Sequence, residues 1–153
     1  MKKLLVVMGA GASIEFGMPS VAKIDKLMDN WAQNYFRIID SDTYDDNLYR
    51  WVKKTFPLPK EDEGNFEKTL FVIQNLASLS ASKDSWLPKV FTVNKEIEFP
   101  KVKLIDGYET IADPSVFAML QSRLNQELAT FMRDRSIELV DTKKKEVKIT
   151  SEF

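Results

Sequence analysis

The chain opens with a short apolar run, Leu4 to Met8, which follows two lysines. A run of this length that is rich in Leu and Val predicts a buried strand over 3–8. Gly9 to Ser13 then predict a tight turn, because glycine adopts backbone conformations that other residues avoid. A short helical turn over 12–16 is expected to follow and to end at Gly17-Met18-Pro19.

Apolar residues then recur at intervals of three and four residues, which predicts an amphipathic helix over about 20–39 with Ser20 as its N-cap. A weaker helix is predicted over 43–55, because Pro57 and Pro59 end the pattern there. Lys60 to Gly64 is expected to be a charged loop.

Two further segments show the same helical spacing. Asn65 is expected to cap a helix whose apolar face is so wide, with Phe71 and Val72 included, that the helix should be nearly surrounded. Asp113-Pro114 opens another long helix with a clear apolar stripe.

Two regions are less regular. Residues 90–105 partly alternate between apolar and polar, which predicts short strands and a hairpin around Asn94-Lys95, with Pro100 favouring a sheet edge. Residues 137–153 fit a hairpin, an extension of the preceding helix or a frayed tail equally well, and Lys143 to Lys145 are most simply a solvated turn.

The length of 153 residues fits one domain, 1–153, with a substantial core, and 44% hydrophobic and 29% charged residues are ordinary for a globular protein. A net charge of −1 gives no strong nucleic-acid signal. The chain has no cysteine and no histidine, which excludes disulfides, thiolate chemistry and imidazole catalysis within it. The lack of cysteine suits a cytoplasmic protein.

A secretory signal peptide is the rival interpretation of the N-terminus, since lysines, an apolar run and Ala10-Gly11-Ala12 occur in that order. The apolar run before Gly9 is short for such a peptide. No run approaches the roughly 18 apolar residues of a membrane span, so we expect no membrane partner.

The predicted strand, glycine turn and helix start together make a site suited to phosphate, because free backbone N–H groups and the helix dipole converge there. The common dinucleotide fingerprint G-x-G-x-x-G does not fit, since Ile14 stands where its third glycine would be. Asp40 would be the matching acid only if 36–39 were a strand, and the helical spacing favours a helix there.

The segment Val6 to Ser13, VVMGAGAS, followed by Gly17 to Ser20, GMPS, resembles the opening of the sirtuin-like (SIR2-like) NAD-binding domains. Members of that family begin with a strand, then Gly-Ala-Gly-x-Ser, then a Gly-hydrophobic-Pro element four residues after the serine. Asn65-Phe66-Glu67 also resembles an element of the bacterial SIR2-like NAD hydrolases of antiphage defence, although Asn65 and Glu67 are explained more simply as a helix cap and a first-turn acid.

The resemblance implies an α/β, Rossmann-like domain, incomplete and helix-rich, with NAD as its ligand and a small hairpin near 90–105. Gly9, Ala10 and Gly11 would present N–H groups to the pyrophosphate. Ala12 and Ser13 would lie at the helix start, with the serine hydroxyl near a phosphate or ribose. Gly17, Met18 and Pro19 would border the nicotinamide side.

The chain departs from the SIR2-like pattern at two points, and both concern catalysis more than nucleotide binding. Ser20-Val21-Ala22 stand where the deacetylases have Asp-Phe-Arg, and the family's catalytic histidine and later asparagine motif have no counterpart; Asn34-Tyr35-Phe36 falls within a helical stripe. We therefore expect nucleotide binding with little or no hydrolysis by this chain. It would be the N-terminal part of a longer protein or a shortened relative, and a homo-oligomer or a missing C-terminal region stays open.

The alternative function is a non-catalytic helical interaction module with a purely structural glycine turn. The large aromatic residues fit a core or an interface better than base stacking, because no basic strip accompanies them. These residues are Trp31, Tyr35, Trp51 and Trp86. A cation site is disfavoured because the acidic residues miss the EF-hand spacing. These acids are Asp40, Asp42, Asp45, Asp46 and Glu61 to Glu63.

Overall fold

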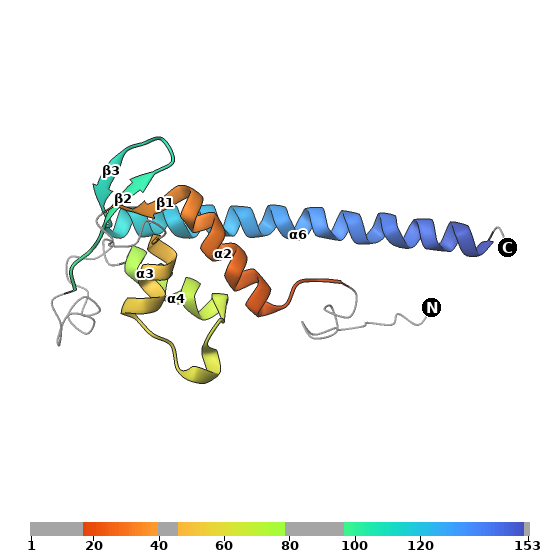
Figure 1. Ribbon diagram of the computed structural model, residues 1–153, viewed down its shortest axis with the longest axis horizontal. Helices are drawn as coiled ribbons and strands as arrows, with labels where there is room; N and C mark the ends of the chain where they lie inside the picture. The colour runs from red at the N-terminus through yellow and green to blue at the C-terminus, as the bar shows by residue number, and fades with distance from the viewer. Residues whose placement is uncertain (1–16, 40–45, 79–96, 152–153) are drawn as a thin grey trace, which may run out of the picture.

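The computed structural model describes residues 17–39, 46–78 and 97–151, with side chains described up to Thr142. The described chain is a helix-rich mixture of α and β structure (Figure 1). In chain order its elements are α2 (Val21–Tyr35), β1 (Phe36–Ile38), α3 (Leu48–Thr55), the 3-10 helix η1 (Lys60–Asp62), α4 (Phe66–Ser78), β2 (Lys101–Leu104), β3 (Glu109–Ile111) and α6 (Pro114–Ser151).

The three described strands form one antiparallel sheet in the order β1-β2-β3. Ile38 pairs with Val102 in β2, and Val102 in turn pairs with Thr110 in β3. β2 and β3 form a hairpin whose turn contains Gly107 at a φ of 87°. Phe36, Ile38 and Val102 are buried, so one face of the small sheet packs on the core.

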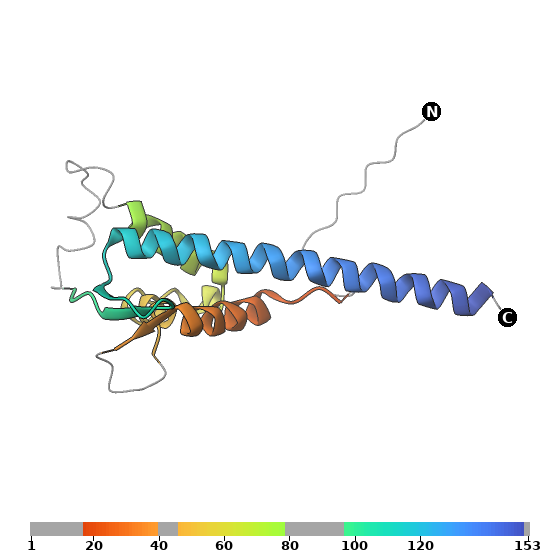
Figure 2. The ribbon, with the colours of Figure 1, turned by 90° about the horizontal axis from the view of Figure 1, so that it is seen from above.

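The core lies between this sheet, helices α2, α3 and α4, and the first part of α6. Its largest fully buried side chains include Tyr49, Phe117, Met28 and Leu120, one or more from each of α2, α3 and α6. Figures 1 and 2 show the other elements gathered around the first part of α6, whose C-terminal part extends beyond them. With 38 residues at about 1.5 Å each, α6 is about 57 Å long.

The first predicted helix begins as expected, with the Ser20 hydroxyl accepting from the N–H of Lys23, but it ends at Tyr35 and not at 39. Residues 36–38 form β1 instead, because Phe36 and Ile38 alternate with exposed Arg37 and pair with β2. Asn34 and Tyr35 are thus the last residues of α2, and Phe36 starts the strand. The second helix begins later than predicted, at Leu48, because Asn47 caps it.

The Asn65 cap is confirmed, since its side-chain oxygen accepts from the N–H groups of Glu67 and Lys68. The expectation that this helix is nearly surrounded is wrong, because Phe71 is 62% exposed. Only one face of α4 is buried, against α6 and its neighbours. The expected charged loop at 60–64 contains the single turn η1.

Asp113 begins the long C-terminal helix, its carboxylate accepting from the N–H of Val116 at 2.9 Å and the hydroxyl of Ser115 at 2.6 Å. These bonds lower the pKa of Asp113. Of the three alternatives for 137–153, the helix extension is the one observed, and it reaches Ser151. The solvated turn at Lys143 to Lys145 is therefore wrong, since these residues continue the helix.

A strand is observed within the predicted range 90–105, since β2 lies there, but the observed hairpin joins β2 to β3 and turns after that strand, around Gly107, and not at Asn94-Lys95. The predicted turn at Asn94-Lys95 lies outside the described residues, as does Trp86. Trp31, Tyr35 and Trp51 pack against the core as expected. In the described ranges, no helix has the length and apolar character that crossing a bilayer requires.

The predicted strand 3–8 also lies outside the described residues. Because it was the one parallel-type strand that the sequence indicated, a Rossmann-like sheet stays a prediction. What the described strands show is an antiparallel sheet at one end of a helical assembly.

Candidate functional site

The predicted site residues divide into two groups. Gly9, Ala10, Gly11, Ala12 and Ser13 lie outside the described residues. Gly17, Met18 and Pro19 are described and lead directly into α2, with Met18 and Pro19 half-buried. We call these three residues the Gly-Met-Pro element.

Gly17 adopts a φ of 87°, which is in the left-handed region that L side chains rarely occupy. The Arg135 guanidinium on α6 donates from Nε to the Gly17 carbonyl at 3.1 Å. A Cβ at Gly17 would lie 3.0 Å from Cδ2 of Leu139. The backbone conformation therefore favours glycine at this position, and a side chain here would also push the end of the Leu139 side chain aside by a few tenths of an ångström.

The start of α2 follows this element at once. Ser20 is extended, and its carbonyl accepts from the N–H groups of Lys23 and Ile24 at 3.0 Å each. The first turn of α2 carries no acidic residue. The helix dipole at this end therefore meets no negative side chain of its own first turn, which leaves the end electrostatically suited to an anionic ligand.

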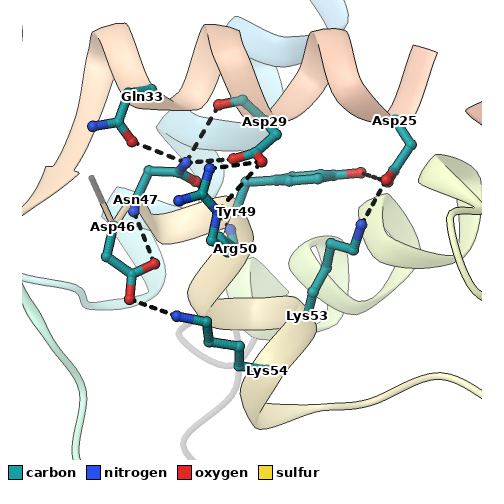
Figure 3. A network of polar contacts seen from close by, with 9 residues as sticks. All are labelled: Asp25, Asp29, Gln33, Asp46, Asn47, Tyr49, Arg50, Lys53 and Lys54. Carbon is teal, nitrogen blue, oxygen red and sulfur yellow. Dashed lines mark hydrogen bonds and ion pairs between the residues drawn. The ribbon is translucent and has the colours of Figure 1, made fainter. Parts of the chain in front are cut away.

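A second polar cluster lies between α2 and α3, and Figure 3 shows its nine residues. At its centre is Asn47, which is fully buried and caps α3 by accepting from the N–H of Arg50 at 2.9 Å. Its side-chain amide donates to the Asp29 carboxylate and to Gln33 Oε1, at 2.5 and 3.1 Å. Asn47 thus joins the start of α3 to two successive turns of α2.

Ion pairs surround this centre. Arg50 pairs with Asp29 at 2.8 Å, and Lys53 pairs with Asp25 at 2.5 Å. A third pair joins Lys54 to Asp46 at 2.9 Å. Each of these three carboxylates therefore has a cationic partner from α3.

Tyr49 completes the network, and its ring points from α3 toward Asp25 on α2 (Figure 3). It is fully buried, and its hydroxyl donates to the Asp25 carboxylate at 2.7 Å. Burial, reinforced by this hydrogen bond and by the negative charge of Asp25, raises the pKa of the Tyr49 phenol well above its ordinary value. The phenol stays protonated and acts as a donor, so the network fastens α3 to α2.

A cavity of about 430 Å³ lies beside this network, lined by Arg50, Lys53 and Lys54 together with the loop that contains Pro57 and Leu58. Its three cations suggest an anion site, but each is already paired with a carboxylate. The positive charge of the cavity wall is therefore compensated within the protein.

The acidic residues considered for a cation do not converge where they are described. Asp46 pairs with Lys54, and Glu61 to Glu63 lie on or directly after η1. No group of three or more carboxylates in the described ranges is arranged to hold a metal ion. Asp40, Asp42 and Asp45 lie outside those ranges.

The sequence interpretation did not identify the Asn47 network. A signal for it was present, because Asp25, Asp29 and Gln33 recur every four residues on one face of α2. Arg50, Lys53 and Lys54 form the complementary basic face of α3. Two charged stripes of opposite sign on neighbouring helices indicate a contact between those helices.

Comparison with known proteins adds no relative: no family model, no curated protein and no solved structure matches this chain.

Proposed function

We propose that this chain binds NAD or a related nucleotide, as part of a SIR2-like NAD-hydrolysing protein of the kind that acts in antiphage defence. The turn from Gly9 to Ser13 would hold the pyrophosphate with its backbone N–H groups, within a Rossmann-like arrangement around the strand 3–8. The Gly-Met-Pro element would border the nicotinamide side.

The observation that carries the proposal is the conformation of Gly17. The SIR2-like pattern has glycine four residues after the serine of its first turn, and Gly17 stands at that spacing from Ser13. Its positive φ favours glycine there, and a Cβ would displace the end of the Leu139 side chain. The resemblance thus includes Gly17, a position whose positive φ favours glycine.

The start of α2 supports the same proposal. Phosphate groups bind readily at helix N-termini, where unpaired N–H groups and the helix dipole favour negative charge. α2 has 15 residues, begins directly after the Gly-Met-Pro element and has no acid in its first turn. A nucleotide held by the glycine turn would therefore meet a favourable field.

We propose that the isolated chain binds the nucleotide but does not hydrolyse it. The family reaction cleaves the bond between nicotinamide and ribose, and its catalytic histidine has no counterpart in a chain that contains no histidine. We expect little or no release of nicotinamide by the isolated chain.

A non-catalytic interaction module is the second candidate. It is favoured by exposed apolar side chains in the second half of α6, where Ile137 is 55% and Val140 is 52% exposed. Exposed apolar groups on a projecting helix are typical of a surface that contacts another protein.

Isothermal titration calorimetry with NAD and with ADP-ribose separates the two candidates. The variant Gly11→Asp places a negative charge where the pyrophosphate would lie, and Gly107→Asp, in the β2–β3 hairpin turn, is its matched control. We expect binding by the parent chain and by Gly107→Asp, and at least about a tenfold loss in Gly11→Asp, which corresponds to about 1.4 kcal/mol.

The folded state of each protein is checked by circular dichroism. Absence of binding heat at millimolar nucleotide, in a protein that is folded, would contradict nucleotide binding and favour the interaction module. Equal affinities of the two aspartate variants would contradict the assignment of the glycine turn.

A further inference from the structure

A second pocket, of about 420 Å³, lies at the end of α2 opposite to Gly17, between the β2–β3 hairpin turn and α6. Phe36, Leu104, Ile105 and Met119 supply its apolar lining. We propose that it binds a small, neutral, largely apolar molecule that presents a carbonyl or amide oxygen to Arg123. This inference is independent of the proposed nucleotide site.

The guanidinium of Arg123 contacts three other side chains at the pocket, those of Tyr35, Gln126 and Glu127. Its Cζ atom lies 4.0 Å from the centroid of the Tyr35 ring, so the two planar groups are in contact. Its Nη2 donates to the Tyr35 hydroxyl and to the Glu127 carboxylate, which also accepts from the Tyr35 hydroxyl. Its Nη1 donates more weakly to Gln126, at 3.3 Å.

One donor of this group is left over. In the part of the chain that the structure describes, Nε of Arg123 is the one buried side-chain N or O atom without a hydrogen-bond partner. A buried donor that has lost water and gained no acceptor destabilises the folded state. Arg123 lines the pocket, so a ligand oxygen would relieve this cost once the guanidinium gives up its long contact with Gln126 and turns Nε toward the pocket.

The charges around the pocket favour a neutral ligand. Glu127 already compensates the charge of Arg123 at 2.8 Å, and Asp106 adds a further carboxylate to the lining. A ligand carboxylate would meet this surplus of negative charge, and a cation would have to give up its hydration to an apolar wall. A neutral acceptor satisfies Nε without either penalty.

The size and the lining agree with a small-molecule site. Such pockets typically measure about 300–1,000 Å³ and combine apolar walls with a few polar groups. Ser122 and Gln126 on α6 add polar groups to the lining beside Arg123. Ile105 is 71% and Met119 is 44% exposed, and a ligand would cover both of these apolar side chains.

Three probes of one shape test the proposal: benzamide, benzoate and toluene, each titrated into the full chain. Binding is followed by NMR on the methyl groups of Ile105 and Met119 and on the Nε–H of Arg123. We expect benzamide to bind about fivefold more tightly than toluene, as one added hydrogen bond would give. Benzamide alone should shift the Nε–H resonance of Arg123, and benzoate should bind most weakly.

The variant Arg123→Met removes the donor and keeps an apolar side chain, with Arg133→Met on the exposed side of α6 as its control. The preference for benzamide over toluene should vanish in Arg123→Met and persist in Arg133→Met. The proposal is overturned if no probe shifts the methyl groups, if benzamide and toluene bind equally, or if benzoate binds most tightly. If Arg123→Met fails to fold, the titrations of the parent chain still test the proposal, because benzamide should shift the Nε–H resonance of Arg123 and toluene should not.

Discussion

Gly17 and Gly107 have the same φ of 87° but different surroundings. Comparing substitutions at the two positions therefore separates the cost of crowding against α6 from the cost of the backbone conformation. A Cβ at Gly17 would lie 3.0 Å from Leu139, whereas a Cβ at Gly107 would meet nothing within 4 Å. We expect Gly107→Ala to cost about 1–2 kcal/mol through backbone conformation alone. Gly17→Ala should cost more, because Leu139 must also move.

Urea unfolding at neutral pH measures both costs. Gly64→Ala serves as a second control, since Gly64 also has a positive φ and open space around it. A cost for Gly17→Ala that is no larger than the two control values would mean that α6 does not constrain this residue.

Tyr49 provides a prediction about pH. Burial raises the pKa of its phenol above the value in the unfolded chain, which is about 10. Because the raised pKa belongs to the folded state, the contribution of Tyr49 to stability is complete below pH 10 and is lost as the pH rises further. We expect the parent chain to lose its advantage over Tyr49→Phe above about pH 10.

Urea unfolding of the parent chain and of Tyr49→Phe at pH 8 and near pH 10.5 checks this. At pH 8 the variant should be less stable by about 1–2 kcal/mol, since Asp25 loses a buried donor. A difference that stays constant across this pH range would show that the Tyr49 phenol does not resist ionisation in the folded chain.

At the scale of elements, helix starts were more predictable than the sheet. Ser20, Asn65 and Asp113 are local signals, because each cap bonds N–H groups within three residues of itself. The boundary between α2 and β1 is different. Ile38 fits a helical stripe as well as a strand, and its pairing with Val102, far along the chain, decides between them.

The link from α6 to the Gly-Met-Pro element gives a prediction at this scale. Arg135 donates to the Gly17 carbonyl, so Arg135→Ala should free residues 17–20 from the helix. Arg133→Ala is the matched control, because Arg133 is exposed and pairs only with its neighbour Asp134 among the interactions described for it.

Amide hydrogen exchange over residues 17–24 measures this effect. We expect exchange there to speed up by about two- to fivefold in Arg135→Ala, as loss of one exposed hydrogen bond would allow, and to stay unchanged in Arg133→Ala. Unchanged exchange in both variants would show that the hydrogen bond does not hold the element.

At the scale of the whole molecule, the sequence indicated a helix-rich α/β chain, and the structure confirms that coarse description. It did not indicate that β1, β2 and β3 form an antiparallel sheet, since strands of three or four residues carry little pattern of their own. The pairing of acidic and basic faces on α2 and α3 also depends on packing, which local periodicity does not reveal.

The proposed nucleotide site stays a prediction, and only its Gly-Met-Pro element lies within the described residues. The glycine pattern pointed to Gly17, and the structure supplies the physical reason for glycine there. The pocket around Arg123 had no signal in the sequence, because α2, the β2–β3 hairpin and α6 assemble it from distant segments. The Gly-Met-Pro element and the pocket at Arg123 lie at opposite ends of α2, so the ligands proposed for them can be distinguished by experiment.

We propose that a nucleotide binds at the glycine turn and the adjoining start of α2. An NMR titration of the full, ¹⁵N-labelled chain with ADP-ribose tests this most directly. We expect saturable shifts of the amides of Gly9 to Ser13 and of Gly17, Met18 and Ser20, with the amides of the β2–β3 hairpin unmoved. Shifts confined to the hairpin, or no shifts at millimolar ADP-ribose in a folded chain, would contradict it.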